Sequence, residues 1–425
     1  MTGMLVGAVT IGDLADRFGR KIGILVSALL LGFGGVVSAV SPNYYIFLLM
    51  RFLTGAGSIG LFQSSVVLAV EFVGTKWRTF TGIIIEIPFA LGEAMTGVLA
   101  VFIRDWRWLI VAVTAPAFLL VSYTWLMPES VRWLMAQGRR GEARKIIETV
   151  GRVNNVEVPR HLLDDHNVEV PTTDGTSSVS ASQIELVNEP LHKDKIKTLV
   201  DLLRTPKTRM RTCIMFFFLS VCALVYYGLS SNSGSLGGNI FVNFIVIMLI
   251  EIPSYIFSFF ILDRMGRKGS LSFVFLLGGF SCLISGFIPE GYDWLVVVLS
   301  MLGKFGIAAA FAIAFVYSTE IFPTEYRSVG VGACSMCSRL GGILAPFIAS
   351  LSDIYKPLPL LLMGVLSLVS GGLMVFMPET VGCELPQTLQ ESESLGSGQS
   401  MWYFVCLEHC QKKSSRQENI IEDNV

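Results

Sequence analysis

The sequence predicts an all-α membrane protein made of two similar bundles of helices. Hydrophobic residues make up 52% of the 425 residues and charged residues only 15%, which is typical of membrane proteins. Long uncharged runs alternate with short basic turns. One turn, GDLADRFGRK at residues 12–21, has a partial second copy, LDRMGRK, at residues 262–268. A repeat of this kind indicates one structural unit used twice.

The uncharged runs predict the individual helices. A helix needs about 20 apolar residues to cross the hydrocarbon core of a membrane. Ten runs, some interrupted by one or two charges, are long enough, and a stub at 4–11 is too short to cross. We expect about eleven of twelve spans to be represented and the first to be missing from the chain. The ten runs are residues 22–40, 45–69, 80–103, 108–127, 212–229, 240–262, 271–288, 294–318, 329–352 and 359–377.

Four regions follow from these runs. They are an N-terminal bundle (1–127), a polar connection with amphipathic helices (128–210), a C-terminal bundle (211–380) and a largely disordered tail (381–425). In the connection, residues 137–153 have apolar side chains at helical spacing, which predicts a helix lying against the membrane. Residues 171–183 have no periodicity, which predicts disorder.

The basic residues predict the orientation. If the 12–21 turn is cytoplasmic, only Arg104, Arg107 and Lys356 lie on the opposite side. Because Lys and Arg accumulate in cytoplasmic loops, the large connection and the C-terminus are expected in the cytoplasm, with the spans in the plasma membrane. In the tail, Cys406 and Cys410 are interpreted as free thiols, with lipidation as the alternative.

The repeated turns also predict a charge latch. Asp16 ends a span, and Arg78 in the next loop on the same side offers a charge-assisted bond. Such a bond holds one side of the protein shut and breaks when that side opens. The alternative is topology alone, with basic residues retained by the positive-inside rule. The residues assigned to gating are Asp16, Arg17, Gly19, Arg20, Glu71, Arg78, Asp263, Arg264, Glu320 and Arg327.

Several motifs together resemble one family. They are G-x-x-x-D-R-x-G-R-K, PESVRWL at 128–134, IEIPSY at 250–255, STEIFPTEYRSVGVG at 318–332 and PET at 378–380. This set, in this order, resembles the major facilitator superfamily, and more specifically its organic cation, carnitine and organic anion transporter family. The resemblance covers nearly the whole chain up to Thr388, and it implies two six-helix bundles that transport by alternating access.

The chain departs from the family pattern at a few places. The family's first span and large extracellular loop have no counterpart in this sequence. Val131 stands where the family has Pro, Phe259 where the second copy of the turn has Gly, and Gln387 where the terminal motif has Glu. The three substitutions leave the expected fold in place, whereas the missing span puts transport activity in question.

Charges inside the apolar runs mark the expected substrate site. Such charges are costly in a membrane and usually line a cavity. Glu86 and Glu93 are seven residues apart and therefore share one helix face. The alternative role for these charges is structural, as internal salt bridges such as Glu251 with Lys304 or with Arg339. The intramembrane charges are Arg51, Glu86, Glu93, Glu251, Lys304 and Arg339.

The resemblance implies a substrate class. Glu251 stands where the cation and carnitine branches have an acid, Tyr255 replaces a lysine of the anion branch, and Arg339 matches the carnitine and anion branches. A carboxylate suits a quaternary ammonium and a guanidinium suits a carboxylate, so small organic cations or carnitine-like zwitterions are expected. Tyr226 and Tyr227 offer cation–π faces, or simply pack between helices. The substrate residues assigned are Glu251, Arg339, Lys304, Tyr226, Tyr227, Tyr255, Glu86 and Glu93.

Other classes are kept as alternatives. A sugar porter shares the turn motifs but needs amide side chains in the spans. An organic anion transporter and a non-transporting truncated product also stay open. An enzyme is not expected, because the histidines lie in polar connectors or the tail and Cys334 and Cys337 lie in an apolar run. We expect no cofactor, metal or nucleic-acid partner, a monomer in the lipid bilayer, and either Na⁺ or H⁺ as a coupling ion, if there is one.

Overall fold

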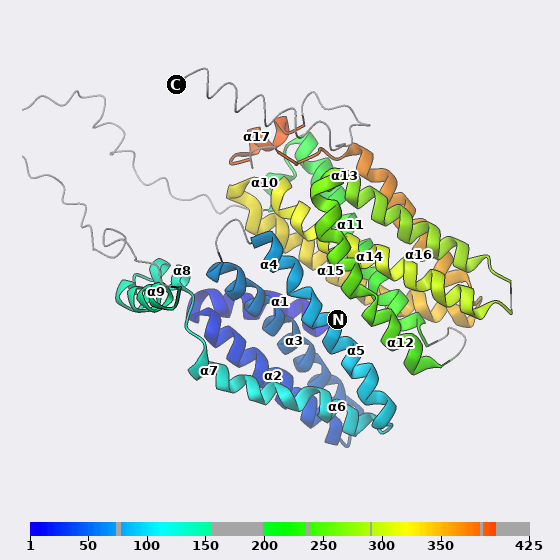
Figure 1. The fold of residues 1–425 in the computed structure, drawn as a ribbon, viewed down its shortest axis with the longest axis horizontal. Coiled ribbons are helices and arrows are strands. Elements are labelled where there is room, and N and C mark those ends of the chain that lie inside the picture. Colours follow the sequence, from blue (N-terminus) through cyan, green and yellow to red (C-terminus); the bar gives the residue numbers. More distant parts are fainter. Residues whose placement is uncertain (74–77, 155–198, 235–238, 290, 383–385, 397–425) are drawn as a thin grey trace, which may run out of the picture.

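Helices make up all the regular structure of the described residues. The computed structural model describes residues 1–73, 78–154, 199–234, 239–289, 291–382 and 386–396. The stretch predicted to be disordered, 171–183, and the two tail cysteines lie outside these residues. Figure 1 shows the helices gathered into two bundles side by side, blue to cyan for the N-terminal one and green to orange for the C-terminal one.

The N-terminal bundle follows the predicted runs. Its first helix continues past the stub to Phe18, because the polar residues of the basic turn belong to its last turns. Its elements are α1 (Thr2–Phe18), α2 (Arg20–Val40), α3 (Tyr44–Phe72), α4 (Arg78–Ile84), α5 (Glu86–Phe102), α6 (Trp106–Thr114), the 3-10 helix η2 (Ala115–Ser122) and α7 (Tyr123–Leu126).

The C-terminal bundle contains six apolar spans. Its elements are α10 (Leu199–Leu202), α11 (Pro206–Asn232), α12 (Ile240–Leu249), α13 (Glu251–Gly286), α14 (Asp293–Ile321), η5 (Thr324–Tyr326), α15 (Arg327–Ala349), η6 (Ser350–Asp353), α16 (Leu358–Leu373), η7 (Met374–Phe376) and α17 (Leu389–Ser394).

Nine helical segments in the described part of the chain are long and apolar enough to cross a membrane. The sequence predicts ten, and the difference lies at 108–127. Here the chain divides into α6, η2 and α7. Pro116 explains the division, because a proline has no N–H to donate and its ring crowds the preceding turn of an α-helix. Residues 106–122 therefore form a shorter apolar helix of mixed type.

Two spans have the same tripeptide, Glu-Ile-Pro, at a boundary between two helical segments. The boundary between α4 and α5 lies just before Glu86 and that between α12 and α13 just before Glu251, and the residue at each boundary keeps helical φ and ψ. Pro88 and Pro253 follow two residues later and remove one backbone hydrogen bond from each helix. Each glutamate consequently lies in the first turn of a new helical segment.

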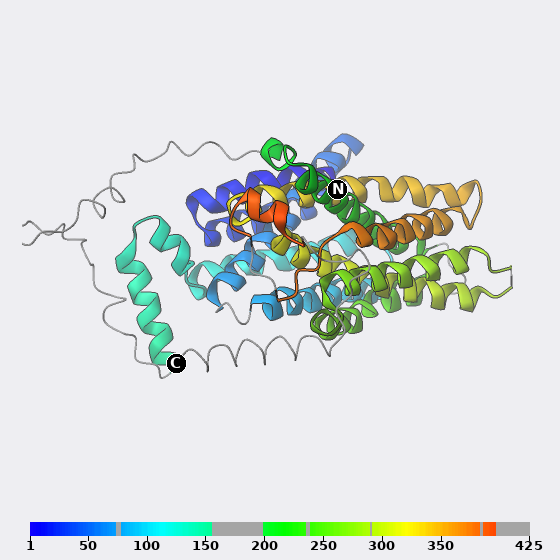
Figure 2. The ribbon, with the colours of Figure 1, turned by 90° about the horizontal axis from the view of Figure 1, so that it is seen from above.

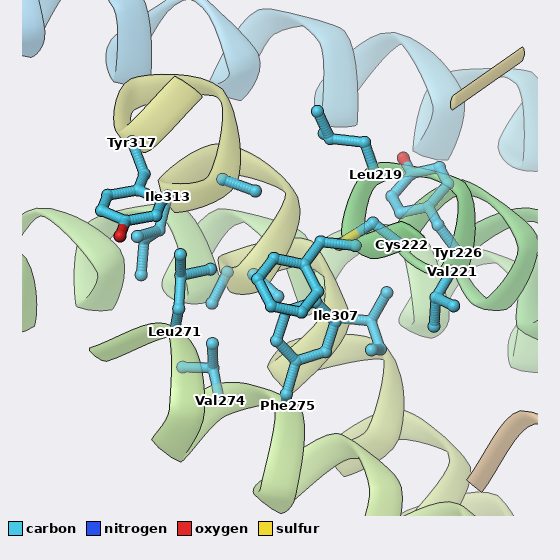
Figure 3. Packing of buried hydrophobic residues seen from close by; sticks show 14 of the residues in the cluster. Leu219, Val221, Cys222, Tyr226, Leu271, Val274, Phe275, Ile307, Ile313 and Tyr317 are labelled. Carbon is cyan, nitrogen blue, oxygen red and sulfur yellow. The ribbon is translucent and has the colours of Figure 1, made fainter. Parts of the chain in front are cut away.

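The C-terminal bundle has the larger apolar core (Figure 3). Phe218 of α11, Phe275 of α13 and Tyr317 of α14 are all completely buried in it. The N-terminal bundle instead uses small residues for close approach. A Cβ atom on Gly7 would lie only 2.5 Å from the Cα atom of Ala56, so α1 and α3 pack almost backbone to backbone, as helices in membranes often do.

The polar connection begins with α8 (Val131–Ala136) and α9 (Arg140–Asn154). Figure 2 shows α9 standing outside the ends of the bundles. A helix is thus present where one was predicted, at 137–153, and its apolar face is partly covered by protein. Its position against the membrane stays a prediction. Ala143 and Ile146 pack against Trp133 and Leu134 of α8, while Val150 is exposed.

The described part of the tail is tied to the C-terminal bundle. The Glu393 carboxylate accepts hydrogen bonds from the backbone N–H groups of Lys207 and Thr208, both at 3.0 Å. Burial acts to raise the pKa of Glu393, but these hydrogen bonds outweigh it and the pKa lies below its usual value. Arg211 donates to the Leu395 carbonyl at 2.7 Å. Residues 386–395 thus close the first turn of α11, where four N–H groups lack helical partners.

Candidate functional site

All eight residues assigned to the substrate site lie in one cluster between the bundles. Glu86 and Glu93 come from α5, at the face of the N-terminal bundle. The other six come from four helices of the C-terminal bundle. They are Tyr226 and Tyr227 of α11, Glu251 and Tyr255 of α13, Lys304 of α14 and Arg339 of α15. Of the intramembrane charges, only Arg51, on α3, is exposed.

An ion pair lies at the centre of the cluster. The Lys304 ammonium is 2.9 Å from Glu251 Oε1, and both side chains have 0% exposure. The ammonium also donates to Ser230 Oγ at 2.8 Å and to the Tyr226 carbonyl at 3.2 Å. A buried pair needs such additional bonds to offset the loss of water around both charges. The internal salt bridge that the sequence left open for Glu251 is the arrangement found.

The Tyr226 side chain is shared between the two bundles. Its hydroxyl oxygen is 2.8 Å from Glu251 Oε2 and 3.1 Å from Glu93 Oε2. Its ring lies under the Lys304 ammonium, 3.1 Å from Nζ to the centroid, which is a close cation–π contact. Figure 3 shows this residue at the edge of the core, with its hydroxyl oxygen turned toward the blue ribbon of the N-terminal bundle.

The remaining members surround this centre. Tyr255 donates a hydrogen bond to Glu251 Oε2 at 3.0 Å. Arg339 is hydrogen-bonded to Tyr227 and interacts electrostatically with Glu86. The Arg339 Nε atom is buried without a hydrogen-bond partner. Three carboxylates therefore face two cations, so the cluster carries one negative charge when all five groups are ionised.

The basic turns form a second, duplicated arrangement at one end of the bundles. Gly19 and Gly266 both have positive φ, 113° and 78°, a conformation that glycine adopts without strain. In the N-terminal bundle, Glu129 Oε1 accepts from the Arg20 N–H at 3.0 Å. In the C-terminal bundle, Glu379 Oε1 accepts from the Arg267 N–H at 2.9 Å.

The arginine after each glycine pairs with a glutamate of a neighbouring helix. Arg20 lies 3.4 Å from Glu71 and also pairs with Asp16. Arg267 lies 3.0 Å from Glu320. These pairs hold α2 to α3 and α13 to α14, so each lies within one bundle rather than across the two. The turns thus brace each bundle in this conformation, and a latch between the bundles stays a prediction.

The other residues assigned to gating lie apart from these pairs. Arg17 pairs with Asp13 at 3.1 Å in an exposed contact, and Arg264 is exposed. Arg327 donates to Thr324 Oγ1 at 3.2 Å. The side chains of Arg78 and Asp263 lie outside the described residues.

Sequence reasoning missed the role of Glu129 and Glu379. In the sequence each appears only inside a family motif, PESVRWL or PET. Each carboxylate nevertheless caps the helix that follows a basic turn, and a Cβ added to Gly19 or Gly266 would lie 2.4 Å from it. The sequence did contain a sign of this role, because each glutamate follows the glycine of its own turn by about 110 residues. Arg267 was missed as well, although it repeats Arg20. No group of His, Cys, Asp or Glu within the described residues is placed to hold a metal ion.

Two helical bundles in a membrane, with a charged cluster at mid-helix between them, define a multi-pass membrane transporter of the alternating-access class. Comparison with known proteins agrees. The family model "Sugar (and other) transporter" matches residues 1–391. The chain belongs to this family, which lies within the major facilitator superfamily and consists of transporters, not enzymes.

The relatives place the chain more narrowly, in solute carrier family 22. It is 39% identical to the organic cation transporter protein of Drosophila melanogaster, over 93% of this chain and 70% of that one. It is 36% identical to solute carrier family 22 member 3 of Mus musculus, over 98% and 70%. The xylose transporter XylE from E. coli shares the fold, with a TM-score of 0.64 over 90% of this chain and 87% of that one, at 17% identity.

Proposed function

We propose that this protein transports small monovalent organic cations by alternating access. The main support is the charge balance of the cluster, in which two cations face three carboxylates that come from both bundles. One negative charge in a site removed from water favours one positive charge on the substrate. The naming of two similar proteins as organic cation transporters supports the same substrate class.

The surroundings of Lys304 support an ammonium substrate. Its own ammonium lies over the Tyr226 ring and beside the Glu251 carboxylate. This combination of a π face and a carboxylate is the environment that a substrate ammonium needs. Since Lys304 occupies the Glu251 side, the substrate cation binds on the other side of Tyr226, between Glu86 and Glu93 of α5 and the Tyr227 ring.

A zwitterion of the carnitine type is the second candidate. The observation in its favour is Arg339, whose Nε is buried without a partner and is thus free to bind a substrate carboxylate. In this arrangement the ammonium lies against α5 and the carboxylate against α15.

We further propose that the protein lies in the plasma membrane, with the 128–210 connection and the tail in the cytoplasm. The distribution of Lys and Arg supports this orientation. The duplicated basic turns and the docked residues 386–395 then lie on the cytoplasmic side, where they contribute to gating.

Uptake by proteoliposomes that contain the full chain tests the proposal. Labelled tetraethylammonium, carnitine, para-aminohippurate and glucose are compared for wild type and for Arg339→Ala, with the exposed Arg104→Ala as the matched control. We expect tetraethylammonium uptake in wild type, and little of the anion or the sugar. If carnitine is a substrate, loss of one charge-assisted bond lowers its uptake about tenfold or more in Arg339→Ala, with a smaller effect on tetraethylammonium. If the variant changes neither, the site assignment is wrong.

A further inference from the structure

A shallow apolar groove lies on the outer wall of the N-terminal bundle, apart from the charged cluster. Figure 1 shows α2 and α7 on the side of this bundle that faces away from the C-terminal bundle. The groove between them therefore opens toward the surrounding lipid and is separate from the substrate site. It is lined by Lys21 and Leu25 of α2, Leu68 of α3, Leu120 of η2, Tyr123 of α7 and Met127.

The groove lies close to one surface of the membrane. Lys21 is the second residue of α2, and Met127 directly follows the last residue of α7. Tyr123 and Trp125 of α7 are 40% and 81% exposed, and tyrosine and tryptophan side chains of membrane proteins gather at the level of the lipid headgroups. The Lys21 ammonium is thus at the depth of the headgroups, and the apolar lining continues toward the acyl chains.

The two copies of the basic turn use their lysines differently. In the C-terminal bundle, Lys268 is 2% exposed and its ammonium donates to the Val375 carbonyl of η7 at 3.0 Å. In the N-terminal bundle, the Lys21 ammonium has no hydrogen-bond or ion-pair partner among the residues that the structure describes, and its side chain lines the groove. The same position of the repeat is therefore bonded to protein in one bundle and faces lipid in the other.

We propose that this groove binds one anionic phospholipid, with its phosphate on the Lys21 ammonium and an acyl chain along Leu25, Leu68 and Leu120. A phosphate beside an ammonium makes a charge-assisted hydrogen bond, and basic pockets between membrane helices bind lipid headgroups in this way. The Tyr123 hydroxyl offers a further donor. The bound lipid joins α2, α3 and α7, and it has no contact with the substrate.

The headgroup is anionic rather than zwitterionic, because the acidic groups of this turn already have partners. Glu129 accepts hydrogen bonds from the backbone N–H groups of Arg20 and Ser130, at 3.0 and 2.9 Å. Asp16 pairs with Arg20. The ammonium of a zwitterionic headgroup would compete with these partners, whereas a phosphate needs only the cation that Lys21 supplies.

Native mass spectrometry of the full chain in a neutral detergent tests the site. The protein is titrated with dioleoyl phosphatidylglycerol or with dioleoyl phosphatidylcholine, which share their acyl chains and differ in headgroup charge. Wild type is expected to bind its first molecule of phosphatidylglycerol about tenfold more tightly than phosphatidylcholine, as one charge-assisted bond predicts. Glycerol 3-phosphate, which has the phosphate but no acyl chain, should not displace the lipid.

Two variants separate the contribution of the charge from that of the groove. Lys21→Gln should remove the preference for phosphatidylglycerol, whereas Lys21→Arg keeps the charge and should retain it. Leu25→Trp fills the groove and should weaken the binding of both lipids about tenfold. If Leu25→Trp does not fold, Leu120→Trp fills the same groove from η2. Lys145→Gln, at an exposed position on α9, is the matched control and should bind both lipids as wild type does.

The outcomes distinguish this site from other lipid contacts. A preference that persists in Lys21→Gln, or an affinity that filling the groove does not change, would overturn the proposal. Equal binding of the two lipids by wild type would overturn it as well, because the groove would then not recognise the headgroup. Displacement by glycerol 3-phosphate would indicate a site for free anions in place of a lipid site. None of these measurements depends on transport, so the proposed function stands or falls separately.

Discussion

At the scale of single residues, the ion pair of Lys304 and Glu251 organises the centre of the protein. Both charges are removed from water, and each has further polar partners on the C-terminal bundle. The pair therefore belongs to one bundle, whereas Glu86 and Glu93 lie on the opposite bundle. On the proposed function, the pair has a structural role and these two carboxylates are the ones that bind the substrate cation.

Lys304→Met should destabilise the protein strongly. It leaves the Glu251 carboxylate buried without its counter-ion, and removal of one partner of a buried pair costs about 3 to 5 kcal/mol. The double variant Lys304→Met with Glu251→Gln leaves no charge and should recover most of that loss. Thermal unfolding of the purified variants in detergent measures both effects.

Lys145→Met, at an exposed position on α9, is the matched control and should unfold as wild type does. The expectation fails if the double variant is as unstable as the sum of the two single changes, because the two sites would then be independent.

At the scale of elements, the duplicated turn combines a glycine with positive φ and a glutamate that caps the next helix. The glutamates, Glu129 and Glu379, lie about 110 residues beyond the glycines in both copies, so the turn is closed by the end of each bundle. Each bundle is thereby fastened at the same place by the same contacts. Such a brace keeps a bundle rigid while it moves as a unit, as alternating access requires.

Gly19→Ala should weaken this brace. An alanine at this position would lower the stability for two reasons. Its φ of 113° is strained for a residue with a side chain, and its Cβ would lie 2.4 Å from a Glu129 oxygen. We expect a loss of about 1 to 3 kcal/mol, measured as a lower midpoint of thermal unfolding. Gly291→Ala separates the two costs, because Gly291 has a similar φ of 105° but open space around its Cβ position. Equal losses at the two sites would mean that the Glu129 contact contributes nothing.

At the scale of the whole molecule, the two bundles meet along α5 and α12. Gly97 of α5 marks a point of close approach, where an added Cβ would lie 2.8 Å from side-chain atoms of Phe244 and of Ile245. The conformation described thus depends on a small residue at this interface. Because alternating access needs the interface to form and separate in each cycle, its packing sets the balance between conformations.

Gly97→Leu should act as a wedge between the bundles. Overpacking costs about 1 to 3 kcal/mol, so the packed conformation becomes rarer and turnover falls by about tenfold or more. Initial rates of tetraethylammonium uptake at saturating substrate measure the change. Gly92→Leu, on the same helix but with open space around it, should stay close to wild type. A similar loss in both variants would indicate damage to α5 rather than to the interface.

The sequence by itself determined most of the membrane spans and the two-copy plan, and it marked the charges from which the cluster is built. Apolar length and repeated motifs are local properties, and charges inside apolar runs tend to gather where polar partners exist, although Arg51 does not join the cluster. It did not reveal that the segment at 108–127 divides into α6, η2 and α7, because a long apolar run does not show where a proline changes the type of helix.

Only the tertiary structure decided how the groups pair. Lys304 joins Glu251 rather than Glu93, Arg20 joins Glu71, and Glu129 caps the turn at Gly19. Which two groups pair depends on differences of a few ångströms in the distances between side chains, on helices that are far apart in sequence. Electrostatic and hydrogen-bond energies fall steeply over such distances in a medium of low dielectric constant, so no pattern along the chain can fix them.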